Sequence, residues 1–474
     1  MQGETTAWEE LTAKTQRVAS TATPSLPIPG HSHSNTDETS IQVCKTAERC
    51  GNQDTVLAVY SQARECRNRA FSVLTLSSRI AIYGLTETSP RDNVRVITAV
   101  RSALEESHLV AYQEVWDMSE KSRDEPLIER WIDPICRPLS IDARKPFVRL
   151  SDGGLMAIAG NATIVSRDDG DSWQAPRPMY RGEGPDLPSP GPGIPTNRGQ
   201  LLATGDGVLV FVWMDVRVLN WDDESGEPGA DAHSDLWSIR SLDGGATWVD
   251  RQRLFEGICG HPPINMIETF NGRIVVTNQY YLRHPGRNVI RVYSSGDAGK
   301  SWRGSNIIDL GGHGHHDGAF EPTFVQRRDG TLWMLIRTNW DRFWEAISED
   351  DGLSWRIIRP SSIEASTSPG YLARLQNGRL LLAWNRLYPE GADSYLRRSG
   401  QLSEDEASWQ REELSVAVSE DEGRSWSAPR VIAREKDAWI SYPYVFEPTP
   451  GLLWVMTGQG DLSLRVVESD LFNG

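Results

Sequence analysis

The sequence predicts an all-β protein whose main domain is a six-bladed β-propeller, because two short patterns recur along its last two thirds. The first pattern, Ser-x-Asp-x-Gly-x-Ser/Thr-Trp, is called the Asp box and spans residues 166–173, 241–248, 295–302, 348–355 and 419–426. The second is an Asp-Gly or Asn-Gly pair before an apolar run, at residues 152–153, 206–207, 271–272, 329–330 and 377–378, with Pro450-Gly451 at the sixth such position. Patterns repeated at such spacing are typical of repeat architectures.

Each repeat contains two predicted β-hairpins. Asp-Gly and Asn-Gly pairs before β-favouring runs, such as residues 332–336, form tight hairpin turns. In the Asp box, the Asp side chain binds local N–H groups, the Gly takes a positive φ, and the Trp anchors the hairpin on the next repeat. Four antiparallel strands repeated six times give a propeller with Asp-box repeats, which we place at residues 136–474.

Residues 1–135 share none of these repeats and are expected to form a small N-terminal segment of mixed structure that is partly disordered. Residues 19–40 are rich in Ser, Thr, Pro and His, as disordered tethers are. Residues 71–84 favour a strand, and residues 94–121 have the apolar spacing of a helix. Free thiols are expected for the five cysteines, which lack metal-ligand spacing: Cys44, Cys50, Cys66, Cys136 and Cys259.

Composition excludes several classes of function. The formal net charge is -16, which disfavours non-specific binding to nucleic acids or anionic membranes. No apolar stretch approaches the roughly 18 residues of a membrane-spanning helix. The start, Met1-Gln2-Gly3-Glu4, lacks the basic and apolar parts of a signal peptide, so the chain as given is expected in the cytoplasm. A different start codon would allow secretion.

Aligning the repeats on their turns predicts where a site lies. The inner strands of a propeller line its central channel, so residues at equal distances from the turn converge on the axis. Eight residues before the turn stand Arg144, Arg198, Pro263, Glu321, Pro369 and Tyr442. Eight or nine residues after it stand Asp215, Gln279, Arg337, Asn385 and Gln459. These two polar rings predict a cup at one mouth of the channel.

The chain resembles the sialidase (neuraminidase) superfamily, whose six-bladed propellers carry Asp-box (BNR) repeats on the face away from the active site. The resemblance covers about residues 140–470. Arg144-Lys145-Pro146 matches the Arg-Ile-Pro motif of that family. Glu321 and the following Arg337 match its catalytic glutamate and second arginine, and Tyr442 in Ser-Tyr-Pro matches its tyrosine nucleophile.

The resemblance implies a substrate that carries a carboxylate on its anomeric carbon, as sialic acids do. Planar guanidinium groups bind carboxylates in a bidentate manner, which gives Arg144 and Arg337 the role of a clamp. A neutral phenol avoids the repulsion that a carboxylate nucleophile would meet. Tyr442 would then be the nucleophile and Glu321 the base that removes its proton.

Two features depart from the family pattern. The family has an acid/base aspartate on a loop of the first blade, whereas residues 153–160 run through Asn161 directly into the first Asp box. The third arginine of the clamp also lacks a specific motif. Its candidates are Arg374 and Arg386, with Arg397, Arg398 and Arg198 as alternatives. Asn385 and Asp215 are further polar residues of the predicted cup.

The run of residues 313–318, His-Gly-His-His-Asp-Gly, precedes the Glu321 strand at the predicted mouth of the cup. Histidine titrates near neutrality, so His316 can replace the missing aspartate as proton donor. The alternatives are a solvated loop or a metal site that includes Asp317; the prediction is no metal and no cofactor. His261 reaches the same rim, and Trp340 and Trp344 can stack on a sugar ring.

The predicted function is a glycoside hydrolase of the exo-α-sialidase type, which removes a terminal acidic sugar from an acidic glycan or sialoglycoconjugate. A second hypothesis keeps the cup but cleaves another acidic glycan, by hydrolysis or by elimination. A third is a carbohydrate-binding propeller without catalysis. Fold alone does not distinguish these hypotheses. The aspartates of the Asp boxes are expected to serve the turns rather than catalysis.

Overall fold

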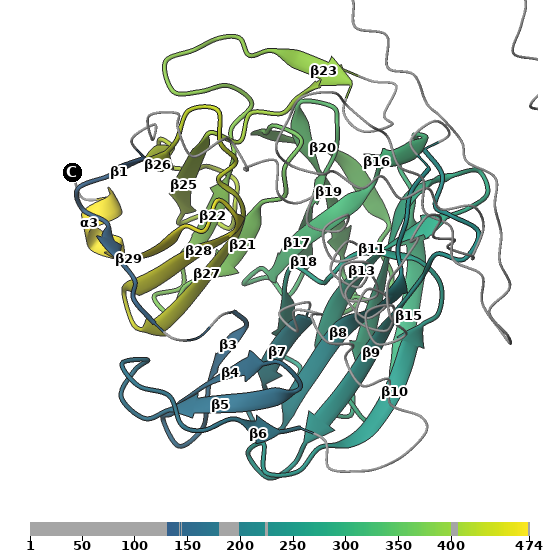
Figure 1. Ribbon diagram of the computed structural model, residues 1–474, viewed down its shortest axis with the longest axis vertical. Coiled ribbons are helices and arrows are strands. Elements are labelled where there is room, and N and C mark those ends of the chain that lie inside the picture. The colour runs from purple at the N-terminus through teal and green to yellow at the C-terminus, as the bar shows by residue number, and fades with distance from the viewer. Residues whose placement is uncertain are drawn as a thin grey trace, which may run out of the picture. The chain divides into compact units, whose positions relative to one another are not determined.

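The computed structural model describes residues 130–141, 143, 145–179, 199–222, 226–399 and 406–472, which all belong to one unit of the chain, Ser107–Gly474. These residues form six antiparallel blades around a common centre (Figure 1). The fold prediction of an all-β, six-bladed propeller is therefore confirmed. The predictions made for residues 1–129, including those for Cys44, Cys50 and Cys66, lie outside the described residues.

The first three blades follow one another along the chain. Blade 1 contains β3 (Phe147–Arg149), β4 (Leu155–Ala159), β5 (Ala162–Ser166) and β6 (Arg177–Pro178). Blade 2 contains β7 (Gly199–Ala203), β8 (Leu209–Val218), β9 (His233–Ser241) and β10 (Val249–Phe255). Blade 3 contains β12 (Met266–Glu268), β13 (Ile274–Leu282), β14 (Arg287–Ser295) and β15 (Arg303–Ile308), joined by β11 (Cys259–His261) and β16 (Gly314–Gly318).

The last three blades repeat the pattern with one insertion. Blade 4 contains β17 (Phe320–Gln326), β18 (Leu332–Arg337), β19 (Arg342–Ser348) and β20 (Ile357–Glu364). Blade 5 contains β21 (Tyr371–Arg374), β22 (Leu380–Trp384), β25 (Glu413–Ser419) and β26 (Arg430–Arg434), with β23 (Arg397–Ser399) and β24 (Glu406–Ser408) inserted as a separate hairpin. Blade 6 contains β27 (Ser441–Thr449), β28 (Leu452–Gln459) and β29 (Ser463–Val467), followed by α3 (Glu468–Phe472).

Two short strands from the start of the described chain close the ring. β1 (Trp131–Ile132) pairs with β26 and extends blade 5. β2 (Arg137–Pro138) pairs with β29 and supplies the fourth strand of blade 6. Pairing thus begins at Trp131, slightly ahead of the predicted domain start at residue 136. Because β2 shares a sheet with β29, the last strand, the ring has no free end between blades 6 and 1.

The Asp-box tryptophans anchor each blade on the blade before it, and not on the next one as predicted. Trp355 of blade 4 packs into an apolar cluster with blade 3, and Trp426 of blade 5 packs into a cluster with blade 4. The box glycine makes close contact there: a Cβ on Gly423, whose φ is +83°, would lie 2.5 Å from the Trp333 ring. Glycine is therefore required at this position of the box.

The five box aspartates all form the same hydrogen-bonded turn. In the fourth box, Asp350 Oδ1 accepts from Ser348 Oγ at 2.8 Å and from Ser354 N at 2.7 Å, and Oδ2 accepts from Ser354 Oγ at 2.6 Å. In the second box, hydrogen bonds from Thr247 and Ser241 lower the pKa of Asp243 to about 2. These contacts support the predicted turn role of the box aspartates.

None of the helices within the described ranges is long and apolar enough to cross a membrane.

Replacing Asp350 with alanine should destabilise the propeller by about 1–2 kcal/mol, because three partly exposed hydrogen bonds are lost. Glu349, an exposed neighbour in the same turn, offers a matched control, and Glu349→Ala should change the free energy of unfolding by less than about 0.5 kcal/mol. Chemical denaturation of both variants measures the difference. Equal effects would contradict a structural role for the box carboxylate.

Candidate active site

Glu321 lies in a β-bulge at the start of β17, the inner strand of blade 4. The register between β17 and β18 shifts between Phe320 and Thr323, and Glu321 has a φ of 48°, which is unusual for a residue with a side chain. Its backbone N donates to Gln279 Oε1 of blade 3 at 2.9 Å. Such local strain persists only when neighbours hold it, and it occurs often at functional sites.

Tyr442 occupies the matching position on β27, the inner strand of blade 6. Its φ is 60°, so the two residues share the same unusual backbone conformation in two different blades. A Cβ on Gly458, on the neighbouring strand β28, would lie 2.9 Å from Tyr442 Cβ. The phenol donates a hydrogen bond to Glu321 Oε1 at 2.7 Å. The propeller therefore joins residues 121 positions apart in a direct contact.

Arg337, the last residue of β18, binds both groups. Its Nη1 donates to Glu321 Oε2 at 2.5 Å and to the Tyr442 hydroxyl oxygen at 3.3 Å. Its Nε and Nη2 both donate to Thr367 Oγ1 at 3.2 Å. The side chain is 1% exposed, so the guanidinium acts in a medium that strengthens its electrostatic interactions.

The electrostatics keep a proton on Tyr442 and a negative charge on Glu321. Burial favours a neutral Glu321, but Arg337, His261 and the hydrogen bonds from Arg337 and Tyr442 outweigh it and lower the pKa of the carboxyl. Burial and the charge of Glu321 raise the pKa of Tyr442 to about 12, against the opposing effects of Arg337 and Arg411. The pair is therefore a neutral phenol that is hydrogen-bonded to a carboxylate.

Arg411 is a second buried guanidinium beside this pair, and the sequence analysis missed it. Its Nη1 donates to Gln459 Oε1 at 2.8 Å, and its Nη2 donates to Thr367 O at 2.8 Å. Its guanidinium lies over the rings of Trp409, Trp439 and Tyr442, 5.1, 4.6 and 5.6 Å from their centroids.

Burial, together with the charge of Arg337, lowers the pKa of Arg411 to about 10. Within the described part of the chain, the ion pairs include none between Arg411 and a carboxylate. A buried cation of this kind is favoured when an anion binds beside it.

Two predicted site residues, Arg144 and Arg198, lie outside the described residues. Their part in the clamp therefore stays a prediction. Lys145, next to Arg144, lies with its Nζ 5.6 Å from the centroid of the Tyr444 ring, on the same strand as Tyr442. The structure therefore brings the beginning of blade 1 against β27, where the Arg144 motif is expected to act.

Arg374 and Arg386, the candidates for the third arginine, form contacts away from the Glu321–Tyr442 pair. Arg374 Nη2 pairs with Glu422 Oε2 at 2.5 Å, close to the turn of blade 5. Arg386 Nη2 lies 3.6 Å from Glu413 Oε2 and lines a hollow of 440 Å³ with Trp384 and Trp426. The described contacts of neither arginine include Glu321, Arg337 or Tyr442.

The described contacts of Asn385 and Asp215 are structural contacts within and between blades. Asn385 Nδ2 donates to Glu413 O at 2.7 Å and to Ile440 O at 2.8 Å, which ties blade 5 to blade 6. Asp215 lies opposite Asp235 in the β8–β9 pair, 3.9 Å from Arg217 Nε. Burial raises the pKa of Asp215, although Arg217 and Arg251 oppose the effect.

The histidine run forms β16 at the edge of blade 3. The centroid of the His316 ring lies 4.1 Å from the centroid of the His315 ring and 5.6 Å from the centroid of the Trp409 ring. Asp317 accepts hydrogen bonds from the backbone N of His313 at 3.0 Å and of Gly318 at 2.8 Å, as a turn residue does. No group of three or more metal-ligating side chains occurs among the residues that the structure describes.

The predicted sugar platform, Trp340 and Trp344, forms an aromatic pair that follows Arg337 along the chain, and Trp344 also packs against the apolar cluster between blades 3 and 4. Trp340 and Trp344 meet edge to face, with ring centroids 5.2 Å apart, and both are partly exposed. Asp341, between them, has a φ of 62° and accepts from Arg397 Nη1 at 2.7 and 2.8 Å. The pair can therefore present an aromatic face from a fixed turn.

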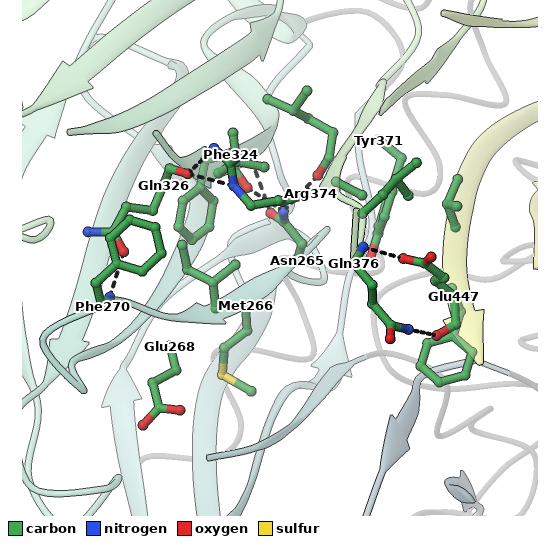
Figure 2. A pocket seen from close by; sticks show the side chains of 17 residues that line it. Asn265, Met266, Glu268, Phe270, Phe324, Gln326, Tyr371, Arg374, Gln376 and Glu447 are labelled. Carbon is green, nitrogen blue, oxygen red and sulfur yellow. Dashed lines mark hydrogen bonds between the residues drawn. The ribbon is translucent and has the colours of Figure 1, made fainter. Parts of the chain in front are cut away.

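A hollow of 380 Å³ lies at the other ends of the inner strands (Figure 2). It is lined by the last residues of β12, β17 and β21 and by residues 445–447 of β27, so it lies away from Glu321 and Tyr442. Its polar groups are bound by the protein itself: Arg374 Nη2 donates to Gln326 O at 2.7 Å, and Glu447 Oε2 accepts from Gln376 N at 2.6 Å. We therefore place the candidate active site at the mouth with Glu321.

These features define a six-bladed β-propeller with Asp-box repeats that carries a tyrosine, a glutamate and two arginines at one mouth of its channel. The BNR repeat-like domain family matches residues 195–455, more than half of the chain. The chain belongs to this family, as the Asp boxes predicted. Comparison with curated proteins finds no match.

Several solved structures are similar in fold. A protein of unknown function from Dyadobacter fermentans has a TM-score of 0.47 and 16% identity, over 71% of this chain and 100% of that one. A Hadza microbial sialidase has a TM-score of 0.45 and 13% identity, over 69% and 65% of the two chains. Trypanosoma rangeli sialidase, in complex with 2,3-difluorosialic acid, has a TM-score of 0.44 and 15% identity, over 73% and 59%. These likenesses concern the fold alone.

Replacing Gly458 with alanine should displace Tyr442 and reduce the free energy of unfolding by about 1–3 kcal/mol, because the new Cβ overpacks the strand pair. Gly205→Ala is the control, since its Cβ would meet nothing closer than 3.6 Å. Denaturant unfolding of both variants, with a crystal structure of Gly458→Ala, gives the measurement. An unmoved tyrosine at full stability would contradict the expected contact.

Proposed function

We propose that this protein is a glycoside hydrolase of the exo-α-sialidase type, which removes a terminal acidic sugar from a glycan. The observation that carries the proposal is the buried contact of Tyr442 with Glu321 and Arg337. A phenol that donates to a carboxylate beside two guanidinium groups has few structural uses. It is well suited to attack on an anomeric carbon that bears a negative group.

The charges favour an acidic sugar as the substrate. Arg337 and Arg411 bring two positive charges to the site, whereas Glu321 brings one negative charge. A bound carboxylate would balance this excess and would find planar, bidentate donors. Arg144, which matches the family motif, is the third proposed member of the clamp, and Trp340 with Trp344 is the proposed surface for a sugar ring.

The proposed reaction begins with the hydrogen bond between the phenol and Glu321. Glu321 accepts the phenolic proton while Tyr442 oxygen forms a bond to the anomeric carbon. The bond between that carbon and the leaving oxygen breaks, and the leaving oxygen needs a proton. Water then displaces Tyr442 from the sugar, giving one proton to the group that protonated the leaving oxygen, and the phenolate recovers its proton from Glu321. The anomeric configuration is retained after two displacements.

A binding-only propeller is the second candidate, and one observation favours it. Strands β4 and β5 are joined by Gly160 and Asn161 alone, so the first blade has no loop for an acid/base aspartate. A site that lacks a proton donor would bind an acidic sugar without cleaving it. The activity of the wild-type protein separates the two candidates.

Tyr442→Phe should reduce hydrolysis of a fluorogenic aryl α-sialoside by at least about 10³-fold, because the nucleophilic oxygen is lost. The matched control is Tyr444→Phe, two residues further along β27, which should keep activity within about tenfold of wild type.

Fluorescence release and calorimetric binding of 2,3-didehydro-2-deoxy-N-acetylneuraminic acid measure catalysis and binding separately. Equal turnover by wild type and Tyr442→Phe would refute the tyrosine mechanism. Binding without turnover by wild type would favour the binding-only propeller.

A further inference from the structure

The proposed reaction requires a group that protonates the leaving oxygen, and the short β4–β5 hairpin does not provide one. The carboxylate of Glu321 is already engaged as the base for Tyr442. Candidates must therefore be titratable side chains that contact the reacting phenol from another blade. Among the described residues, His261 of blade 3 makes such a contact.

His261 is the last residue of β11, and its ring stacks on the ring of Tyr442. The ring centroids are 5.2 Å apart, and the ring planes meet at 26°. Pairing of His261 with Gln279 on β13 fixes its backbone, and the same Gln279 side chain holds the backbone N of Glu321. One residue of blade 3 thus sets the relative positions of the histidine and the glutamate.

The hydrogen bonding of His261 assigns roles to its two ring nitrogens. Nδ1 lies 2.6 Å from Pro262 O, and a carbonyl oxygen only accepts hydrogen bonds, so Nδ1 carries the proton of the neutral ring. Nε2 is then the nitrogen that gains and loses a proton. A fixed Nδ1–H donor with a reactive Nε2 is a common arrangement in general acid/base catalysis.

The surroundings of His261 make its protonated form more acidic than an ordinary imidazolium. Burial lowers the pKa of the imidazole below 6.5; Glu321 on β17 opposes this effect, while Lys145 before β3 and Arg337 on β18 add to it. Tyr442 on β27 faces the ring as a neutral phenol. An acid that releases its proton readily to a leaving oxygen is favoured by these surroundings.

His316, the donor predicted from sequence, has different described neighbours. Its ring lies against those of His315 and Trp409, and its carbonyl oxygen accepts a hydrogen bond from Asn339 Nδ2. His315 stacks on Trp221 with centroids 3.6 Å apart, and burial with the charge of Arg337 lowers its pKa to about 3. The described ring contacts of this run do not include Tyr442.

We propose that His261 is the catalytic acid/base of this site, an inference that rests on the proposed function. When Tyr442 oxygen bonds to the anomeric carbon, the glycosidic C–O bond breaks and its electron pair stays on the leaving oxygen. Protonated His261 gives its Nε2 proton to that oxygen. In the second step, neutral His261 removes a proton from the attacking water, the Tyr442–sugar bond breaks, and Glu321 returns its proton to the phenolate.

Two substrates that differ only in leaving group test this role. The leaving group of 4-methylumbelliferyl α-sialoside is acidic and departs without a proton, whereas the lactose of 3'-sialyllactose needs one. His261→Gln should lower kcat/KM for sialyllactose by about 10²–10⁴-fold, the usual contribution of a general acid, and that for the aryl sialoside by less than about tenfold.

Azide, which attacks without a general base, should raise the turnover of the aryl sialoside by the variant. His284→Gln, at an exposed position of the β13–β14 hairpin, is the control and should behave as wild type on both substrates.

The outcomes separate this role from the proposed function. Equal losses on both substrates in His261→Gln would mean that the histidine only positions Tyr442, and would overturn the proposal. A leaving-group dependence in His316→Gln instead of His261→Gln would also overturn it. If the wild-type protein cleaves neither substrate, the proposed function is refuted, and the proposed role of His261, which depends on it, is refuted as well.

The pH dependence of the wild-type protein gives a second test that needs no variant to fold. Because the protonated imidazole is the active form, kcat/KM for sialyllactose should fall as pH rises through a pKa below 6.5, whereas kcat/KM for the aryl sialoside should lack this limb. The same limb for both substrates would contradict proton donation by His261.

Discussion

The hydrogen bond between Tyr442 and Glu321 depends on a closed ring of blades. Blade 6 is completed by β2, which lies ahead of blade 1 in the chain, and so the first and last parts of the propeller are held in one sheet. Closure directs the inner strands β17 and β27 to the same axis. The 2.7 Å contact between the phenol and the carboxylate then follows from the positions of two whole blades.

The neighbours of this contact hold an arrangement that neither strand would adopt alone. Glu321 and Tyr442 both have positive φ values, which cost a residue with a Cβ about 1–3 kcal/mol. Gln279 binds the backbone of Glu321, and Gly458 leaves space for Tyr442. At the opposite ends of the blades, the Asp-box turns and their tryptophans fasten each blade to its neighbour. Rigid packing at the Asp-box face thus helps to hold Glu321 and Tyr442 in their unfavourable backbone conformations at the other face.

The site carries more positive than negative charge, which favours an anionic ligand. Arg337 compensates Glu321, but the described hydrogen bonds of Arg411 go to the neutral oxygens of Gln459 and Thr367. Thr367 joins the two guanidinium groups through its hydroxyl and its carbonyl oxygen. The site thus keeps a positive charge in a buried position, where an anionic ligand would replace lost hydration.

The repeats in the sequence by themselves determined the number of blades and the positions of Glu321, Arg337 and Tyr442, because a fixed count from each turn is a fixed distance along a strand. Arg374, offered as a candidate for the third arginine, stands only three residues before its turn, and the structure places it there with Glu422. The count from the turns could not identify Arg411, because this residue precedes β25, the third strand of its blade, after the inserted hairpin β23–β24.

Only the tertiary structure decided which side chains meet across blades. His261 stacks on Tyr442 and Arg411 lies over it, although neither has a sequence pattern in common with the tyrosine. The physical reason is that repeats encode contacts within a blade, whereas contacts at the axis depend on how six blades close together.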